Sequence, residues 1–310
     1  MTGAGRREEL REEIRSGLGG ARAQLEAANA KIEAKAGRNL FLALGVGLLL
    51  GGLFLLALFI EKSWFPLFVG FFTTLAVIEL ATAFRVSGRR VPRIGAALGA
   101  ILIIVGTAFW QATGMLVGLF AAAALLVLWR LVESFVPRWD APPKTLLRDA
   151  VSGIFVLVYG PFLGGFAILL SQADRGDWWV FTLVLLVVAC DVGAYAAGVM
   201  FGRHKMTPRI SPNKTWEGFA GAAVLAIIAG VPMAIVALQQ DWWVGMVLAI
   251  VVLLTATGGD LTESLIKRNL GVKDMSTWVP GHGGLFDRLD SLLPSAIGAY
   301  AVALVIGVFA

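Results

Sequence analysis

The chain has 310 residues, of which 58% are hydrophobic and only 15% are charged, and its mean hydropathy is +0.80. Soluble chains carry roughly 25% charged residues, so this composition excludes a water-soluble globular domain. The formal net charge is +5, and Cys190 is the one cysteine, so no intramolecular disulfide is possible.

Nine apolar stretches are long enough to cross a hydrocarbon core of roughly 30 Å. The sequence therefore predicts an all-α polytopic membrane protein with about nine transmembrane helices. The fifth stretch carries Gly160 and Pro161 in its middle, and the sixth contains Asp191, so these two depart most from a plain apolar helix. The predicted spans are 40–60, 64–84, 93–110, 113–133, 149–170, 178–200, 217–238, 242–259 and 292–309.

The basic residues alternate between the segments that join these stretches. The tail before residue 40 holds 8 of them, and the loops near 85–93, 130–148, 201–216 and 260–291 hold 4 each. The alternate segments hold only Lys62 and Arg175. The positive-inside rule then predicts a cytoplasmic amino terminus and a carboxyl terminus outside. Because the first stretch begins only at Leu40, behind the charged tail, we expect no cleavable targeting signal.

Three regions follow from this pattern. Residues 1–38 form a charged cytoplasmic arm, residues 39–170 form plain transmembrane helices, and residues 171–310 form a transmembrane region whose loops 201–216 and 260–291 hold most of the reactive side chains. Glu79 is the exception in the plain region, since an ionisable group inside a span is costly. Either it has a functional role, or it pairs with an arginine near the helix end such as Arg85.

The first polar segment runs from Asp191 to Gly218. Asp191 and Tyr195 lie one helical turn apart and share a face of the sixth span. Ser211, Lys214 and Thr215 come directly before the seventh span, whose amino terminus offers free N–H groups to an anion. This segment therefore predicts a phosphate site, although basic loops also occur at inner membrane surfaces for lipid attraction alone.

The second polar segment is Gly259 to Arg268, at the end of the eighth span. On a helix, Asp260, Glu263, Ser264 and Lys267 fall at i, i+3, i+4 and i+7 and form one stripe. An ordinary surface ion pair would give the same spacing. The polar, glycine-rich helix end before the stripe favours a site that can be approached closely.

The third polar segment is Lys273 to Ser295. Residues 280–284 read Pro-Gly-His-Gly-Gly, which predicts a compact turn containing His282. Asp287 and Asp290 follow at i and i+3, on one face at the start of the last span. Carboxylates in a first helical turn also suit the helix dipole, so capping is the alternative.

The topology brings these segments to one membrane face. Two acidic pairs there lie near Lys214, Lys267, Arg268, Lys273 and Arg288. Carboxylates without paired cysteines or histidines favour a hard cation such as Mg²⁺, and the neighbouring cations suit phosphate groups. The chemistry indicated is phosphoryl or nucleotidyl transfer, with no Walker loop and no dinucleotide fingerprint.

Residues Ser264 to Asp290 carry the run S-x-x-K-R-x4-K-D-x-S-x3-P-G-H-G-G-x-x-D-R-x-D. Together with the D-x-x-A-Y block at Asp191 and the S-P-x-K-T-W-x-G block at Ser211, this run resembles the phosphatidate cytidylyltransferase (CDP-diacylglycerol synthase) family. The likeness covers about 191–295. Val279 and Ala222 depart slightly from the pattern, and neither is a charged position.

The resemblance implies that CTP and phosphatidic acid react with Mg²⁺ at the cytoplasmic face of the cell inner (plasma) membrane, giving CDP-diacylglycerol and pyrophosphate. It implies a lipid bilayer environment, no nucleic-acid partner and a homodimer. Asp260, Asp287 and Asp290 would hold the metal, and Asp260, Asp287, Lys214 and Lys267 would be catalytic. The substrate-binding residues would be Asp191, Tyr195, Ser211, Thr215, Glu263, Ser264, Arg268, Lys273, His282 and Arg288.

Two other functions stay open at this point. A CTP-dependent lipid-alcohol kinase would share the spans and the nucleotide, but would transfer the γ-phosphate to a hydroxyl and need an activating base. A membrane transporter would account for Asp191 and Glu79 inside spans. It predicts polar groups spread through the membrane depth, whereas here they gather at one face.

Overall fold

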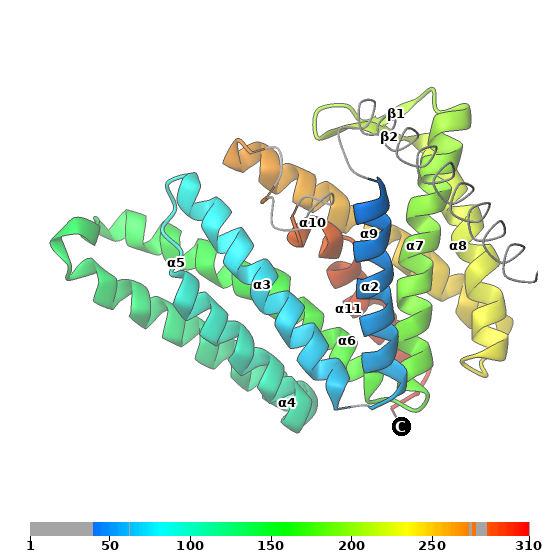
Figure 1. Cartoon of the computed structure of the whole chain (residues 1–310), viewed down its shortest axis with the longest axis horizontal. Coiled ribbons are helices and arrows are strands. Elements are labelled where there is room, and N and C mark those ends of the chain that lie inside the picture. Colours follow the sequence, from blue (N-terminus) through cyan, green and yellow to red (C-terminus); the bar gives the residue numbers. More distant parts are fainter. Residues whose placement is uncertain (1–39, 62, 273–274, 277–283, 310) are drawn as a thin grey trace, which may run out of the picture. The chain divides into compact units, whose positions relative to one another are not determined.

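A computed structural model describes residues 40–61, 63–272, 275–276 and 284–309 (Figure 1). The predicted arm 1–38 lies outside the described residues. The chain divides into two compact units, Met1–Leu53 with Val279–His282, and Phe54–Trp278 with Gly283–Ala310. The described part of the first unit is one apolar helical segment, residues 40–53. All contacts below belong to the second unit.

Helices make up nearly all of the described chain, which confirms an all-α polytopic membrane protein. Among the described residues, seven helical segments are long and apolar enough to cross a membrane. The elements are α2 (Leu40–Phe59), α3 (Trp64–Val86), α4 (Arg93–Ser134), η1 (Pro137–Trp139), α5 (Pro143–Leu157), η2 (Val158–Phe162), α6 (Leu163–Ser171), α7 (Gly176–Phe201), β1 (Lys205–Thr207), β2 (Ser211–Thr215), α8 (Trp216–Val236), α9 (Trp242–Leu270), α10 (Phe286–Leu289) and α11 (Leu292–Val305).

Helix α4 has 42 residues, about twice what one crossing needs. Its backbone leaves helical geometry at Trp110 and Gln111, where the φ of Gln111 is 54°. On either side of this kink the two arms pack antiparallel, so that Gly106 lies against Gly114 and Gly95 against Trp129. The arms correspond to the stretches 93–110 and 113–133 that the sequence separates.

The fifth predicted span is continuous in spite of its proline. Pro161 has no N–H to donate, and the helix passes it through one π-helical turn, η2, between α5 and α6. Together these three elements form the segment Pro143–Ser171, which is long enough to span. The π-turn buries Tyr159, Gly160 and Pro161 against neighbouring helices.

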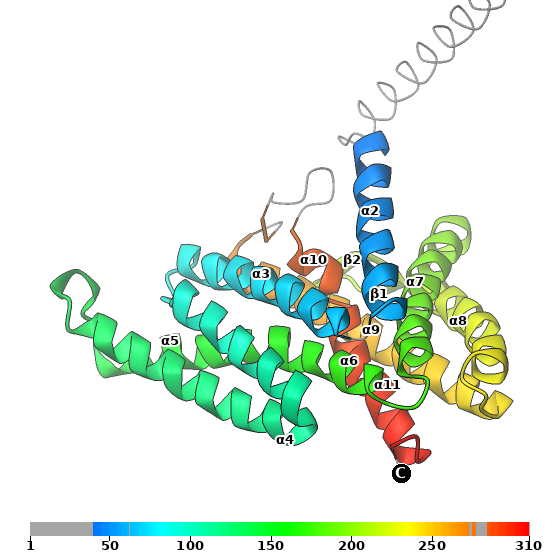
Figure 2. The same cartoon turned by 60° about the horizontal axis from the view of Figure 1, so that its bottom comes forward.

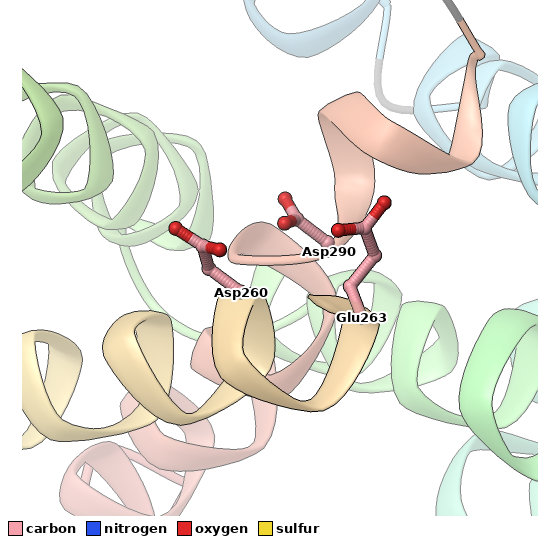
Figure 3. Close-up of side chains that lie close together, drawn as sticks. All are labelled: Asp260, Glu263 and Asp290. Atoms are coloured by element: carbon pink, nitrogen blue, oxygen red, sulfur yellow. The ribbon is translucent and has the colours of Figure 1, made fainter. Parts of the chain in front are cut away.

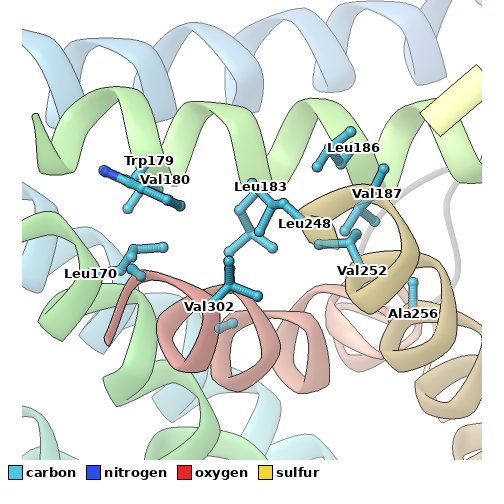
Figure 4. Close-up of a cluster of buried hydrophobic side chains, with 14 of the residues drawn as sticks. Leu170, Trp179, Val180, Leu183, Leu186, Val187, Leu248, Val252, Ala256 and Val302 are labelled. Atoms are coloured by element: carbon cyan, nitrogen blue, oxygen red, sulfur yellow. The ribbon is translucent and has the colours of Figure 1, made fainter. Parts of the chain in front are cut away.

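Two buried hydrophobic clusters hold the helices together. The first joins α7, α9 and α11 through side chains such as Leu183, Leu248 and Val302, which interleave in Figure 4. The second joins α3, α4 and α5, and it also takes in Phe286 of α10. Figure 2 shows α3 beside α4, and α11 beside α6, in a second orientation. The last two helices therefore connect both clusters.

The predicted loop 201–216 contains a β-hairpin. Strands β1 and β2 pair antiparallel, with Lys205 opposite Thr215 and Thr207 opposite Ser211. The hairpin is fastened to α8, because the Glu217 carboxylate accepts hydrogen bonds from the amides of Arg203 and His204. This attachment fixes where the side chains of β2 lie.

A buried ion pair joins the helix ends near loops 85–93 and 130–148. Arg130 Nε lies 3.0 Å from Asp149 Oδ2, with the two side chains 3% and 1% exposed. The amide of Arg90 donates to the other oxygen of Asp149, at 3.0 Å. Arg90 also pairs with Glu133, at 2.7 Å. These contacts place both basic loops at one end of the helices.

Replacing Asp149 by asparagine leaves the buried Arg130 guanidinium without a carboxylate. We expect a loss of about 3–5 kcal/mol in the free energy of unfolding, measured by denaturant titration in mixed micelles. Glu133→Gln is the matched control, since its partner Arg90 is 22% exposed, and we expect a loss of only about 1 kcal/mol. Equal losses in the two variants would show that burial does not set the energy of these pairs.

Candidate functional site

The three polar segments meet at one end of the helices. Lys214, the fourth residue of β2, places its Nζ 2.7 Å from Asp260 Oδ2 on α9. Asp290, between α10 and α11, lies against the same part of α9. Because Glu79 of α3 bonds to Phe286 of α10, the loop near residue 85 belongs to this end as well. The predicted meeting of the segments is thus present in the structure.

Three carboxylates converge on one point. Asp260, Glu263 and Asp290 each offer an oxygen, and these oxygens all lie within 4.8 Å of one another. Figure 3 shows the side chains projecting into a common space from α9 and from the junction of α10 and α11. Glu263 and Asp290 are buried, at 3% and 9% exposed. An oxygen-only set of this size fits a hard divalent cation, which takes oxygen ligands at roughly 2.1 Å for Mg²⁺.

Lys267 lies between two acidic side chains. Its Nζ is 2.5 Å from Glu263 Oε1, one helical turn away, and 3.3 Å from Asp287 Oδ1 on α10. Both oxygens are buried and make no hydrogen bond of good geometry with the described residues. The other oxygen of Asp287 accepts from the amide of Gly284, at 3.2 Å. Asp287 thus contacts Lys267 and the Glu263 carboxyl group, although it is not one of the three carboxylates that converge.

The hydroxyl of Thr215 caps the start of α8 as an acceptor and keeps its own O–H as a donor. Thr215 is the N-cap residue, and its Oγ1 accepts from the amide of Gly218, at 3.1 Å. This cap satisfies one of the amides that a helix amino terminus leaves without a partner. The contribution of Thr215 is therefore to orient β2, and Lys214 with it.

Two cavities adjoin β2. The first, of about 310 Å³, reaches among the spans and is lined by Asp191 and Tyr195 of α7 as well as Phe219 and Ala222 of α8. The second, of about 580 Å³, lies at the helix ends and is lined by Ser264, Lys267 and Arg268. Ser211 and Asn213 line both cavities. The first cavity therefore reaches Lys214 and Asp260, the second reaches Lys267 and Arg268, and the two adjoin at Ser211 and Asn213.

The backbone around the carboxylates is closely packed. A Cβ on Gly259 would overlap the carbonyl oxygen of Asp290, so only glycine lets α9 and the start of α11 approach this far. The hydroxyl of Tyr159, in the π-turn η2, donates to the carbonyl of Gly259, at 3.2 Å. These contacts fix the position of Asp260 relative to Asp290.

Most predicted site residues lie in or beside this arrangement. Ser264 Oγ approaches Asp260 Oδ1 at 3.5 Å, as the predicted stripe requires. Arg288 is exposed on α10. Lys273 and His282 lie outside the described residues, so their roles stay predictions. The metal set predicted from the resemblance was Asp260, Asp287 and Asp290, whereas the described carboxylates within reach of one ion are Asp260, Glu263 and Asp290.

Sequence reasoning left three groups out of the site. Asn213 lines both cavities and lies within the quoted S-P-x-K-T block, so its place in that block was a usable signal. Tyr159 gave no signal beyond its place next to Gly160 and Pro161. Glu79 stands out in the sequence as a charge inside a span, but its partners do not. Its carboxylate accepts hydrogen bonds from Ser276 Oγ and, at 2.8 Å, from the amide of Phe286.

Fold and charge together define a class of protein. The centre brings four acidic side chains, Asp260, Glu263, Asp287 and Asp290, together with the ammonium groups of Lys214 and Lys267. Cavities on either side, one of them among membrane spans, suit a lipid-linked and a water-soluble reactant. The molecule thus has the form of an integral membrane enzyme that acts on anionic substrates.

Comparison with known proteins names the particular family. The profile of the cytidylyltransferase family matches residues 42–306. The chain is 40% identical to the phosphatidate cytidylyltransferase of Mycobacterium leprae over 277 residues, covering 86% of this chain and 88% of the relative. It is 35% identical to that of Pseudomonas aeruginosa, covering 82% and 91%. This chain belongs to the cytidylyltransferase family, and the predicted resemblance is confirmed.

Gly259 and its neighbour Gly258 offer a matched pair for testing the close approach of α9 and α11. Gly259→Ala should push the helices apart and lower the unfolding midpoint by several degrees, because its Cβ meets backbone. Gly258→Ala meets nothing within 4 Å, and alanine favours helix by about 0.8–1 kcal/mol, so this variant should be neutral or slightly stabilised. Thermal unfolding in detergent measures both, and a stable Gly259→Ala variant would contradict the packing argument.

Proposed function

We propose that this protein is a phosphatidate cytidylyltransferase, which transfers CMP from CTP to phosphatidic acid and releases pyrophosphate. The observation that carries the proposal is the charged centre beside the two cavities. There the ammonium groups of Lys214 and Lys267 each contact one of the three converging carboxylates. The family membership and the names of its relatives support the same reaction. The product is CDP-diacylglycerol, an intermediate for phospholipid biosynthesis.

The two cavities suit the two substrates in different ways. The 310 Å³ cavity has apolar walls from within the spans, such as Phe219 and Ala256, which suits a lipid phosphate whose acyl chains stay in the bilayer. The 580 Å³ cavity at the helix ends is lined by Lys267 and Arg268, and its size fits a nucleoside triphosphate. Asn213 lines both cavities and is followed directly by Lys214, so the reacting phosphates would meet here.

The reaction needs positioning and charge neutralisation more than proton transfer. The phosphate of phosphatidic acid is already ionised near neutral pH, so its oxygen attacks the α-phosphorus of CTP directly. The new P–O bond replaces the bond to the β-phosphate, and pyrophosphate leaves with that electron pair. Lys214 and Lys267 orient the phosphates and offset the charge that develops on the transferred and leaving groups.

A divalent cation, Mg²⁺ in this proposal, would be held by Asp260, Glu263 and Asp290. Their all-oxygen set and the surplus negative charge suit such an ion, with remaining ligands from phosphate and water. When bound, it would neutralise phosphate charge and polarise the α-phosphate. Asp287 then acts through Lys267, whose ammonium group it helps to orient.

We further propose nine membrane crossings, with the amino terminus cytoplasmic and the carboxyl terminus outside. Counting α2 and both arms of α4 extends the seven apolar segments to nine. The clustering of basic loops at one helix end supports a cytoplasmic active site in the cell inner (plasma) membrane, where CTP is available. The homodimer that the resemblance implies stays a prediction.

The activity is tested with purified protein, labelled CTP, phosphatidic acid and Mg²⁺. We expect equal amounts of CDP-diacylglycerol and pyrophosphate. With diacylglycerol in place of phosphatidic acid, we expect no transfer of the γ-phosphate. Lys214→Met should reduce turnover by about 10²-fold or more, since removing one group that stabilises developing charge has effects of this size. A well-folded wild-type protein without product would refute the proposed function.

The metal ligands are tested by the dependence of the rate on Mg²⁺. Asp290→Asn should raise the Mg²⁺ concentration for half-maximal rate by about 10-fold or more, as losses around metal sites commonly do. Asp287→Asn should lower kcat with a smaller change in that concentration, because Asp287 contacts Lys267. A larger shift for Asp287→Asn would instead favour Asp260, Asp287 and Asp290 as the ligands.

A further inference from the structure

Glu79 is a buried carboxylate that the proposed reaction does not use. It lies in α3, more than 180 residues before the acidic residues of α9, and its side chain is 1% exposed. An ionised group buried at this depth is costly unless hydrogen bonds compensate it. The hydrogen-bond partners of Glu79 therefore indicate its role.

Both carboxylate oxygens reach the segment that leads into α10. Oε1 accepts from the hydroxyl of Ser276, and Oε2 accepts from the amide of Phe286, at 2.8 Å. A Cβ on Gly284 would overlap the same carboxylate, so the backbone there passes directly over Glu79. Two points of this segment are thus fastened to one side chain of α3.

The contact with Phe286 has the form of a helix cap supplied from another helix. Phe286 is the first residue of α10, and its N–H is one of those that a helix start leaves without a partner. The residue before it, Leu285, provides no side-chain cap. Helix α10 has four residues, too few to hold its own geometry without outside contacts.

From this cap the contacts run directly to the charged centre. Asp287 follows Phe286 in the same turn, and its two oxygens meet the Gly284 amide and Lys267 Nζ. Lys267 in turn contacts Glu263, one of the three converging carboxylates. Rotating the start of α10 would therefore move the carboxylate that orients the Lys267 ammonium group.

We infer that Glu79 is a positioning residue for the reaction: its carboxylate fixes the first turn of α10 and so sets the place of Asp287 and Lys267. The inference rests on the proposed function, because it assigns Glu79 a role in that same site. It differs from a purely structural role in one respect. A structural residue changes the folded fraction, whereas a positioning residue changes kcat of the folded enzyme.

The test is the kinetics of Glu79→Gln, which keeps the shape but removes the charge and one acceptor. We expect kcat to fall about 10²-fold, the scale known for misplaced catalytic groups, with the KM for CTP changed less than about threefold. The unfolding midpoint in detergent gives the folded fraction used to correct kcat. Glu133→Gln, which removes a carboxylate paired to Arg90 outside the site, should keep wild-type kinetics.

Ser276→Ala is the second variant, since it removes one donor to Glu79 and keeps the carboxylate. It should lower kcat by a smaller factor, and in the double variant Glu79→Gln with Ser276→Ala it should add nothing further. A folded Glu79→Gln enzyme with wild-type kcat would overturn the inference. If Glu79→Gln does not fold, an unchanged kcat in Ser276→Ala overturns it. An inactive wild-type enzyme would instead refute the proposed function.

Discussion

The surplus of negative charge at one end of the helices is the constraint on which the rest of the site depends. Glu263 and Asp290 are almost fully buried, and such carboxylates cost several kcal/mol each unless cations or hydrogen bonds compensate them. Lys214 and Lys267 supply part of that compensation. Lys267 reaches Glu263 through helical spacing alone. The position of Lys214 beside Asp260 depends on tertiary structure: the β1–β2 hairpin, the Thr215 cap of α8 and the hydrogen bonds from the hairpin to Glu217.

The amino-terminal helices serve the site even though they carry none of the signature residues. Glu79 of α3 and Tyr159 of η2 both hydrogen bond to backbone next to the acidic residues, one at Phe286 and one at Gly259. Phe286 is itself fully buried and packs on Tyr159, with ring centroids 5.4 Å apart. The site is therefore stabilised both by contacts among the signature segments and by contacts from α3 and η2.

The periodicity of the sequence was enough to predict the features that depend on residues close together in the chain. The stripe on α9 and the spans follow from spacing and hydropathy, and the loop charges predicted which loops meet. Tertiary contacts were beyond reach, because the spacing of residues does not reveal that Glu79 bonds to Phe286 instead of Arg85. Asp287 and Asp290 also separate for a local reason. Asp287 accepts from the Gly284 amide and meets Lys267, whereas the Asp290 carboxylate accepts from the amide of Ser291, at 2.7 Å.

The pairing of both lysines with carboxylates is compatible with phosphate binding, because an ammonium group has three N–H donors. Lys214 contacts Asp260, and its side chain is 23% exposed and lines the first cavity. The carboxylates hold each ammonium group in place before a phosphate arrives, which reduces the side-chain entropy lost on binding. Since the carboxylates also offset the lysines' charge, the proposed reaction assigns part of the phosphate binding to the cation that the converging oxygens would hold.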